Sequence, residues 1–472
     1  MSKKEVNNFL YEDEYLKYES YLKDFTKEKF QEFDVIAKKI GLDSKIKDLI
    51  NSKIVNETEN QAALHPEYRR INLGGFSKPE VITSSSKNYD FESGKKFYEG
   101  IEKEFNSCKG SNETVNIISI GIGGSFEGPK LMLEAVNPFG GWHGSHMKYE
   151  FITGPNSNEF TKKVNNLNPK KTFFIVFSKS FETIETLEML RMALDWSGDT
   201  KKFLALTSNA NKPKEFGISY IHTFDKEIGG RYSIWLEDIA KLFGQQDSIS
   251  KRQRPFHLGG SIADNKILDD KEYLNFVKYL SYSDIWMNNF NQKHTRVILS
   301  YYWKLRSFPA YVQQLEMESL GKPANISSKY KKTGQVIFGG YGPKAEHSYL
   351  QLLHQGTQEM CADIIACDED KNELEYIKAI TQTRLLSEGA EDLEKNEKIN
   401  GNVPVNLFIV KEEGIKRDGY NNIVESLGYL IATWEYRTYI TATMLDINPF
   451  DQFGVNAGKK YTSARKFIKD SS

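Results

Sequence analysis

The residues best suited to chemistry lie in short polar turns, and each turn follows a run of apolar residues. The first turn, Gly121–Pro129, combines several glycines with the hydroxyl of Ser125. Glycines let backbone N–H groups approach closely, so such a turn suits an anionic ligand. Its spacing matches neither familiar nucleotide loop, because Phe126 stands where the dinucleotide pattern needs glycine and Gly128-Pro-Lys130 replaces the Gly-Lys-Ser/Thr ending. Taken alone, the turn fits a plain strand-to-helix connection equally well.

A second turn places hydroxyls at the start of a predicted helix. Its polar side chains are those of Ser178, Lys179, Ser180 and Thr183. Free N–H groups and the helix dipole favour a phosphate at such a position. A single Ser or Thr there is more commonly an N-cap, but the combination of hydroxyls with a lysine favours a phosphomonoester site. Glu185 follows on the same helix, where a carboxylate is usually solvated.

Three further charged residues each allow two interpretations, a functional one and an ordinary structural or solvated one. Arg231 follows Gly230, which would let a guanidinium and the backbone hold one charge together, although a surface arginine is the commoner case. Glu318 ends a helix that is apolar on one side, so it is either a carboxylate inside a cleft or an exposed helix residue. Lys459 lies seven residues after Gln452, about two helical turns, where a lysine is usually solvated. The residues alone leave these alternatives open.

The histidines and cysteines lack the spacing of a metal site. His347 and His354 are seven residues apart on one predicted helix, whereas zinc motifs usually pair histidines about four apart. A clear third ligand is also missing. The same objections apply to the other close pairs, His143 with His146 and Cys361 with Cys367. We therefore expect no bound metal.

Composition indicates a globular protein of a reducing compartment. The 472 residues carry 63 Lys and Arg against 64 Asp and Glu, a formal net charge of -1. The chain thus lacks the basic field that binding to nucleic acid or an acidic membrane would need. Three cysteines argue against a disulfide framework, and no apolar window of about 18 residues is present to span a bilayer. With no secretion signal at its start, the chain is expected to be cytoplasmic, without nucleic-acid or membrane partners.

Alternating strands and helices must position these turns. Apolar runs at 115–122, 172–177 and 203–206 indicate buried parallel strands, each followed by a helical pattern. A second series of strands is predicted at 296–301, 335–338, 362–366 and 405–410. Ligands of such sheets bind outside the carboxyl ends of the strands, which is where the polar turns lie.

The predicted fold class is α/β, with two doubly wound lobes built on parallel sheets. The first lobe is expected at 86–255 and the second at 256–445. A helical N-terminal extension would occupy 1–85, and a C-terminal helix would lie within 446–472.

Six separated motifs, in order between Ile117 and Lys459, resemble those of the phosphoglucose isomerase family, also called glucose-6-phosphate isomerase. They include the segments that end at Ser125, Thr183, Ser233, Lys322, Thr357 and Val455. The resemblance implies two sugar-isomerase (SIS) lobes, each a flavodoxin-like three-layer αβα structure, and a homodimer. It also implies that the C-terminal helix within 446–472 completes the active site.

The resemblance also implies a role for each matching residue. Glu318 would be the base that moves a proton from C2 to C1 through a cis-enediol, and Arg231 the cation beside the developing enediolate. His347, reaching across the dimer interface, and Lys459 would open the sugar ring, while Glu185 orients the histidine. The implied phosphate- and substrate-binding residues are Gly124, Ser125, Ser178, Lys179, Ser180, Thr183, Gly230, Gln314 and Gln452.

The implied reaction interconverts glucose 6-phosphate and fructose 6-phosphate in glycolysis and gluconeogenesis, with a hexose 6-phosphate as substrate and neither cofactor nor metal. Two alternatives stay open: a sugar-phosphate sensor without turnover, and an isomerase that also accepts mannose 6-phosphate. The chain departs from the family pattern at Phe126–Glu127, at 339–346, at Phe453 and at Asn456. None of these departures replaces a residue assigned to proton transfer.

Overall fold

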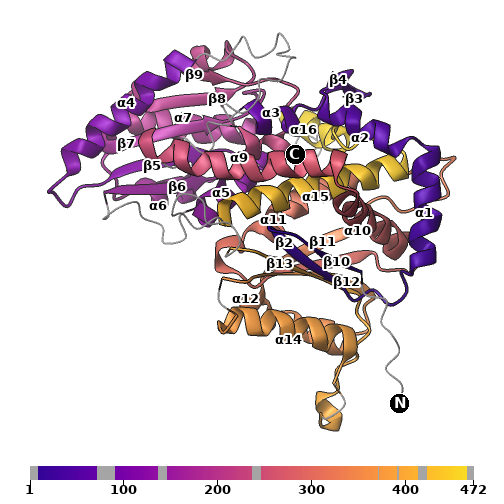
Figure 1. The fold of residues 1–472 in the computed structure, drawn as a ribbon. Coiled ribbons are helices and arrows are strands. Elements are labelled where there is room, and N and C mark those ends of the chain that lie inside the picture. The colour runs from indigo at the N-terminus through magenta and orange to yellow at the C-terminus, as the bar shows by residue number, and fades with distance from the viewer. Residues whose placement is uncertain are drawn as a thin grey trace, which may run out of the picture. The chain divides into compact units, whose positions relative to one another are not determined.

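The computed structural model describes residues 9–71, 91–136, 146–236, 246–369, 371–390, 393–412 and 423–464. The chain divides into two compact units. Unit 1 consists of Met1–Ile71 with Arg254–Phe453, and unit 2 consists of Asn72–Gln253 with Gly454–Ser472. Each unit contains one large sheet with helices packed on it (Figure 1), which confirms the predicted α/β class.

The sheet of unit 2 has five parallel strands in the flavodoxin-like order β6-β5-β7-β8-β9. The strands are β5 Val115–Ile120, β6 Met147–Ile152, β7 Thr172–Phe177, β8 Phe203–Thr207 and β9 Tyr220–Thr223. Every residue of β5, β7 and β8 is buried, as expected for strands covered on both faces. The strand order reverses between β5 and β7, so a ligand is expected beyond the carboxyl ends of these two strands.

Helices cover both faces of this sheet. They are α4 Phe91–Cys108, α5 Gly124–Val136, α6 Ser157–Val164 and α7 Ile184–Ser197, with 3-10 helices η2 Pro169–Lys171, η3 Thr200–Lys202, η4 Lys212–Phe216 and η5 Gly230–Trp235. Apolar residues of α6 and α7 share one core cluster with β5, β7 and β8. On the other face, the ring of Phe97 in α4 lies edge-on to that of Phe173, with centroids 5.6 Å apart. The C-terminal helix α16, Asn456–Ser463, belongs to the same unit.

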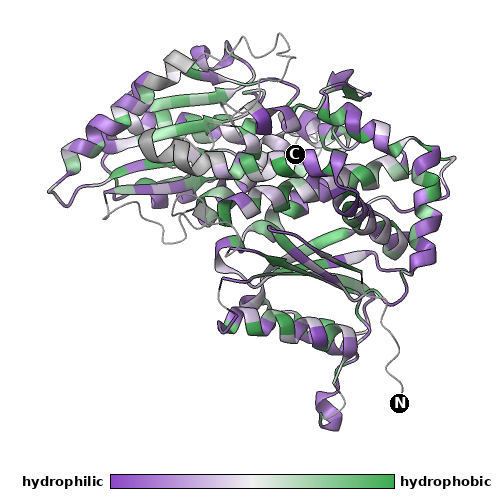
Figure 2. Ribbon diagram, viewed as in Figure 1, coloured by the Kyte–Doolittle hydropathy of each residue, from purple (hydrophilic) through white to green (hydrophobic). Residues whose placement is uncertain are grey.

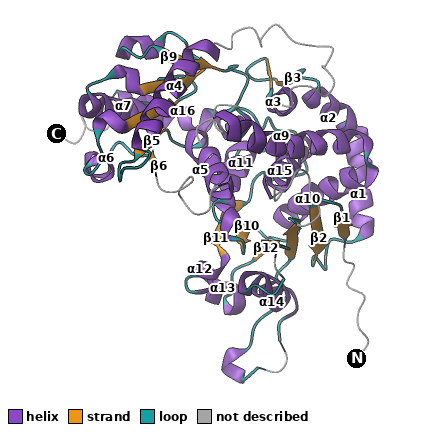
Figure 3. Ribbon diagram, turned by 60° about the vertical axis from the view of Figure 1, so that its left-hand side comes forward, coloured by secondary structure: helices purple, strands orange, loops and turns teal. Residues whose placement is uncertain are grey.

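The sheet of unit 1 has six strands in the order β1-β2-β13-β12-β10-β11 (Figure 3). The strands are β1 Leu10–Glu12, β2 Leu16–Ser20, β10 Thr295–Ser300, β11 Val336–Tyr341, β12 Met360–Cys367 and β13 Val405–Val410. β10 to β13 are parallel, and their order reverses between β10 and β12. A small separate hairpin is formed by β3 Ile54–Asn56 and β4 Gln61–Ala62.

Residues 10–20 correct the expectation of a purely helical N-terminal region, because they form β1 and β2. Leu16, Tyr18 and Ser20 are buried while the residues between them are half-buried, which is the alternation of a strand. β2 pairs antiparallel with β13 and thus covers an edge of the parallel sheet. The helices expected further on are present as α1 Lys27–Lys39, α2 Leu42–Ile50 and α3 His65–Ile71. Residues 72–90 of the predicted extension lie outside the described residues.

Helices also cover both faces of the unit 1 sheet, and colouring by hydropathy shows both apolar and hydrophilic strand segments in it (Figure 2). The helices of this unit are α9 Gln246–Asp269, which begins in unit 2, α10 Lys271–Asn289, α11 Phe308–Leu320, α12 Gly342–Glu346, α13 Leu350–Gln355, α14 Leu374–Glu388 and α15 Ile423–Leu445, with η6 Trp303–Leu305 and the exposed η7 Lys395–Glu397. α12, α13 and α14 share a core cluster with one face of the sheet. On the other face, Trp434 of α15 lies 5.0 Å from Phe408 of β13, measured between ring centroids. Within the described part of the chain, no helix combines the length and apolar character needed to cross a membrane.

A network of buried charges joins this second face to its helices. Arg437 of α15 donates to Asp284 of α10 at 2.7 Å and to Asp363 of β12 at 2.9 Å. Arg296 of β10 pairs with Asp284 and with Glu316 of α11. Burial alone would raise the pKa of Asp284, but the two guanidiniums outweigh it and lower that pKa. Since a buried charge is stable only when paired, the network fixes how α10, α11 and α15 lie on the sheet.

Candidate active site

The loop after β5 brings the first glycine-rich turn against η5. A Cβ at Gly124, the first residue of α5, would lie 2.1 Å from the carbonyl oxygen of Gly230. The hydroxyl of Ser233 donates to the carbonyl oxygen of Gly230 at 2.7 Å and to that of Gly124 at 3.4 Å. Ser125 follows in the first turn of α5, and Arg231 in η5 is only 2% exposed. The structure thus brings the Gly124 and Arg231 motifs, which are far apart in the sequence, into backbone contact.

The loop after β7 carries the predicted phosphate-binding residues. Ser178 is buried, and its hydroxyl donates to the hydroxyl oxygen of Thr183 at 3.4 Å. The carbonyl oxygen of Lys179 accepts from the hydroxyls of Thr207 at 2.9 Å and Ser208 at 2.8 Å, both at the end of β8. Ser180, in the middle of the loop, is exposed. The neighbouring strand therefore holds the backbone of this loop in place.

One residue of the same loop has a strained backbone. Phe181 has a φ of 54°, in the left-handed region that non-glycine residues rarely adopt. Such a conformation costs about 1–3 kcal/mol and persists only where the surroundings impose it. Burial of the Phe181 ring, which is 1% exposed within the core cluster of unit 2, offsets that cost.

The loops after β5 and β7 leave the sheet side by side. A Cβ at Gly121 would lie 3.1 Å from the carbonyl oxygen of Phe177, the last residue of β7. Two helices, α5 and α7, begin just beyond these loops. Hydroxyls, a lysine and helix N-termini at one switch point make an arrangement suited to a phosphorylated ligand.

In unit 1, α11 carries Gln314 and Glu318 one turn apart. The amide of Gln314 donates to the carboxylate of Glu318 at 3.3 Å, and both side chains are half-buried. Just beyond the helix end, the ammonium of Lys322 donates to the carbonyl oxygens of Glu318 at 2.5 Å and Asp451 at 2.6 Å. Asp451 directly precedes Gln452. The structure thus joins the Glu318 motif to the C-terminal motif within unit 1.

Three of the predicted site residues have exposed side chains. They lie at the end of a helix or on the C-terminal helix. Glu185 lies in the first turn of α7, His347 directly follows α12, and Lys459 lies on α16. The predicted residues therefore form two groups by unit. Unit 2 holds Gly124, Ser125, Ser178, Lys179, Ser180, Thr183, Glu185, Gly230, Arg231 and Lys459, and unit 1 holds Gln314, Glu318, His347 and Gln452.

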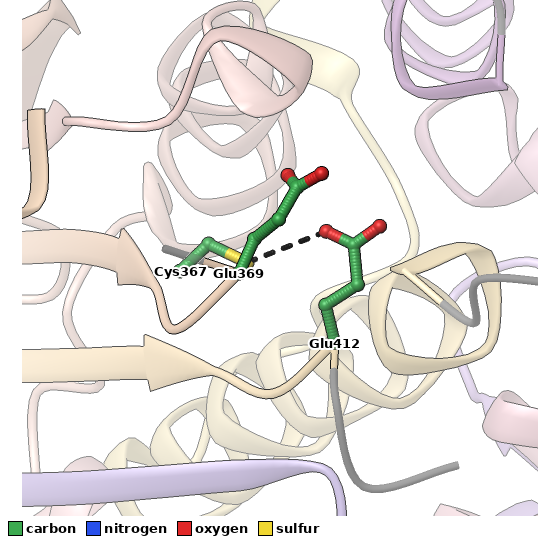
Figure 4. A group of neighbouring side chains, drawn as sticks. All are labelled: Cys367, Glu369 and Glu412. Carbon is green, nitrogen blue, oxygen red and sulfur yellow. Dashed lines mark hydrogen bonds between the residues drawn. The ribbon is translucent and has the colours of Figure 1, made fainter. Parts of the chain in front are cut away.

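Among the described residues, one cluster has the geometry to hold a metal ion. It consists of Cys367, Glu369 and Glu412, whose potential ligand atoms lie within 4.8 Å of one another (Figure 4). The ammonium of Lys304 is 3.1 Å from an oxygen of each glutamate and already compensates their charge. Burial raises the pKa of the Cys367 thiol, and burial together with the hydrogen bond to Glu369 raises that of Glu412. Because the Lys304 ammonium already pairs with both carboxylates and a thiol with a raised pKa is a poor metal ligand, we assign no metal to this cluster.

Sequence reasoning missed two groups of polar residues. Lys322 and Asp451 lie inside motifs that the sequence analysis identified. A lysine just after a helix end can bond to the last carbonyls of its own helix, so the sequence did not indicate a bond from Lys322 to Asp451. Glu369 and Glu412 meet because β12 and β13 are neighbours in the sheet. The available signal was that each follows the carboxyl end of a predicted parallel strand.

Comparison with known proteins points to one family. A family model described as phosphoglucose isomerase matches residues 20–471. A glucose-6-phosphate isomerase of Shewanella sp. (strain ANA-3) is 32% identical over 465 residues, covering 90% of this chain and 82% of the relative. Another, from Shewanella sp. (strain MR-4), is 32% identical over 474 residues and covers 92% of this chain and 84% of the relative.

Solved structures share the fold. A glucose-6-phosphate isomerase from Chlamydia trachomatis has a TM-score of 0.79 at 21% identity, covering 100% of this chain and 92% of that one. A hypothetical protein from Thermus thermophilus has a TM-score of 0.60 at 19% identity, covering 85% of this chain and 94% of that one.

Proposed function

Because the chain belongs to the phosphoglucose isomerase family, we propose that it interconverts glucose 6-phosphate and fructose 6-phosphate, an aldose–ketose step of glycolysis and gluconeogenesis. The observation that carries the proposal is the family match over residues 20–471, which spans all six motifs between Ile117 and Val455. The reaction needs only a positioned base, proton donors and an electrostatic stabiliser, so no redox cofactor or metal is required.

The loop after β7 would bind the phosphate of the substrate. Hydroxyls of Ser178, Ser180 and Thr183 and the ammonium of Lys179 are the donors that we assign to it, with the N-terminus of α7 adding a favourable dipole. The backbone of Gly124, with Ser125 and Gly230, would contact the sugar. Fixing the phosphate in this way would hold the reacting carbons against the catalytic groups.

Glu318 would act as the general base that moves a proton between C2 and C1 through a cis-enediol. The hydrogen bond from Gln314 orients its carboxylate along α11, and Gln314 and Gln452 would contact the substrate. Arg231, whose guanidinium is held in a buried turn, would stabilise the negative charge of the enediolate. A fixed cation of this kind lowers the barrier because it does not need to reorganise during the reaction.

Ring opening would precede the isomerisation. We assign it to His347 and Lys459, with Glu185 orienting the histidine. The proposal includes a homodimer in the cytoplasm, in which His347 of each subunit serves the site of its partner. A lone subunit would then have an incomplete site.

A coupled assay tests the reaction and its base together. Fructose 6-phosphate is supplied, and the glucose 6-phosphate formed is followed by its onward oxidation. The wild type should turn over, and Glu318→Gln should lose at least ~10²-fold in kcat while still binding the sugar phosphate. Glu188→Gln, an exposed glutamate on α7, is the matched control and should retain full activity. Binding without turnover by the wild type would instead support a sugar-phosphate sensor.

Mixing two inactive variants tests the role of His347 across the dimer. In a mixed dimer of Glu318→Gln and His347→Ala subunits, one site would carry both substitutions and the other neither. Co-folding equal amounts should therefore restore about a quarter of the wild-type activity. If His347 acts within its own subunit, every site stays defective and the mixture stays inactive.

A further inference from the structure

The ammonium of Lys322 connects two segments that are far apart in the sequence. It donates to the carbonyl oxygen of Glu318 at 2.5 Å and to that of Asp451 at 2.6 Å. It also lies 3.5 Å from a carboxylate oxygen of Asp451. A lysine ammonium has three donors, so one side chain can hold both backbones at once. The side chain is only 11% exposed, which makes the contacts less screened than those of a surface lysine.

One of these contacts supplies a hydrogen-bond donor to a carbonyl group near the end of α11, the helix that carries Glu318. The last carbonyl groups of an α-helix have no intrahelical partner, and α11 ends at Leu320. The amide N–H of Lys322 bonds to Leu320 rather than to Glu318, and the Lys322 ammonium donates to the carbonyl of Glu318 instead. A positive charge at this position also interacts favourably with the helix dipole. The backbone of Glu318 is therefore held by the Lys322 side chain.

The other contacts hold the residue directly before Gln452. Asp451 is nearly buried, and its carboxylate also accepts from the hydroxyl of Thr58 at 2.8 Å. The amide of Asn448 donates to the same Thr58 hydroxyl at 2.6 Å. Asp451 is thus fixed from two sides, by Lys322 and by the segment between β3 and β4. These bonds therefore also restrict the position of the backbone at Gln452, the next residue.

We propose that Lys322 is a positioning residue that holds the backbones of Glu318 and Asp451 together, and so aligns the general base with the substrate-contacting Gln452. This inference rests on the proposed function, because it assumes that Glu318 is the base. It assigns Lys322 no contact with the substrate. Loss of the ammonium is expected to displace the base rather than to remove a binding group, and a displacement of about 1 Å costs roughly 10²-fold in rate.

Two variants of Lys322 separate positioning from general stability. Lys322→Met keeps the length of the side chain but removes its charge and donors, whereas Lys322→Arg keeps both. Lys331 is the matched control, since its ammonium also donates to two carbonyl oxygens, those of Ile326 and Ser328, in an exposed loop. We expect Lys322→Met to lower kcat about 10- to 100-fold with little change in KM. Lys322→Arg should recover most of that loss, and Lys331→Met should match the wild type.

Rescue of kcat by Lys322→Arg, measured per mole of folded enzyme, is a readout that a merely structural role would not move. A double substitution adds a second readout, because Lys322 and Asp451 act through one contact. In Lys322→Met with Asp451→Asn, the loss in kcat should be less than the product of the single losses.

The outcomes distinguish this inference from the proposed function. If the wild type and Glu318→Gln behave as expected but Lys322→Met keeps wild-type kcat, the positioning role is wrong and the isomerase proposal stands. A folded Lys322→Met protein with an unchanged kcat and a raised KM would also overturn it, because that result indicates a binding group. If the wild type binds the sugar phosphate without turnover, the failure lies with the proposed function.

Discussion

Gly124 and Gly230 lie backbone against backbone, although 106 positions separate them in the chain. A Cβ on Gly124 would come within 2.1 Å of the carbonyl oxygen of Gly230 and 2.7 Å of the amide nitrogen of Arg231. Real Cβ atoms do not approach backbone this closely, so only glycine fits at position 124. The same contact sets the position of Arg231 relative to the start of α5.

We expect Gly124→Ala to impair catalysis by displacing Arg231. The added methyl group must push η5 away from α5, and misplacement of a charge stabiliser by about 1 Å costs roughly 10²-fold in turnover. Steady-state kinetics with fructose 6-phosphate measures the effect. Gly100→Ala in α4 is the control, because its Cβ would meet the nearest atom, of Phe173, at an ordinary 3.5 Å. Equal activity of the two variants would contradict the argument.

Hydroxyls of the loop after β7 should matter for binding more than for turnover. Ser180→Ala and Thr183→Ala each remove a donor proposed for the phosphate, and a hydrogen bond to a charged group contributes about 1.5–3 kcal/mol. KM should rise about 10-fold or more, with kcat nearly unchanged. Inhibition by inorganic phosphate should weaken in parallel. Ser197→Ala, at the opposite end of α7, should change neither quantity.

Removal of Arg437 should destabilise unit 1 strongly. Arg437→Met leaves Asp284 and Asp363 with less compensation in a buried site, and breaking a buried ion pair costs about 3–5 kcal/mol. The free energy of unfolding from urea titration measures the loss. Arg384→Met removes an exposed arginine paired with Glu388 on α14 and should cost less than about 1 kcal/mol. Similar losses for the two variants would show that the buried network contributes little.

Asp13 should make the stability of unit 1 depend on acid pH. Burial alone would raise its pKa, but hydrogen bonds from Lys266, Tyr11 and Tyr429 outweigh burial and lower that pKa below the ordinary value. The folded state therefore favours the carboxylate, so the contribution is present above the ordinary pKa and is lost as the pH falls through the folded pKa. Asp13→Asn should lose about 1.5–3 kcal/mol at pH 7.

Urea titrations of the wild type and Asp13→Asn at several pH values test this dependence. The difference in unfolding free energy should be constant from neutral pH down to about pH 5 and should shrink at lower pH. The control is Asp195→Asn, an exposed aspartate of α7, which should cost less than about 1 kcal/mol at neutral pH. A difference that grows toward acid pH would have the wrong sign for a carboxylate with a lowered pKa.

Local pattern was enough to predict seven strands of the two large sheets and the motifs that follow them, but not β6 or β9. The apolar runs that form β5, β7, β8 and β13 are continuous because both faces of these strands are covered, so each strand is recognisable without its neighbours. The polar turns are local as well, since glycine and hydroxyl residues are needed wherever a chain must turn and bind an anion. These features carried the family resemblance, which the comparisons confirm.

Relationships between distant segments were decided only by the tertiary structure. The N-terminal strands could not be predicted because β2 is stabilised by pairing with β13, about 390 positions away. Lys322 and Asp451 are 129 positions apart, and no local pattern of either residue indicates the other. The contact between Gly124 and Gly230 likewise depends on where α5 and η5 pack. Sequence by itself therefore determined the family and its motifs, whereas packing determined which of those motifs make backbone contacts with one another, because long-range contacts leave no periodic signal in the chain.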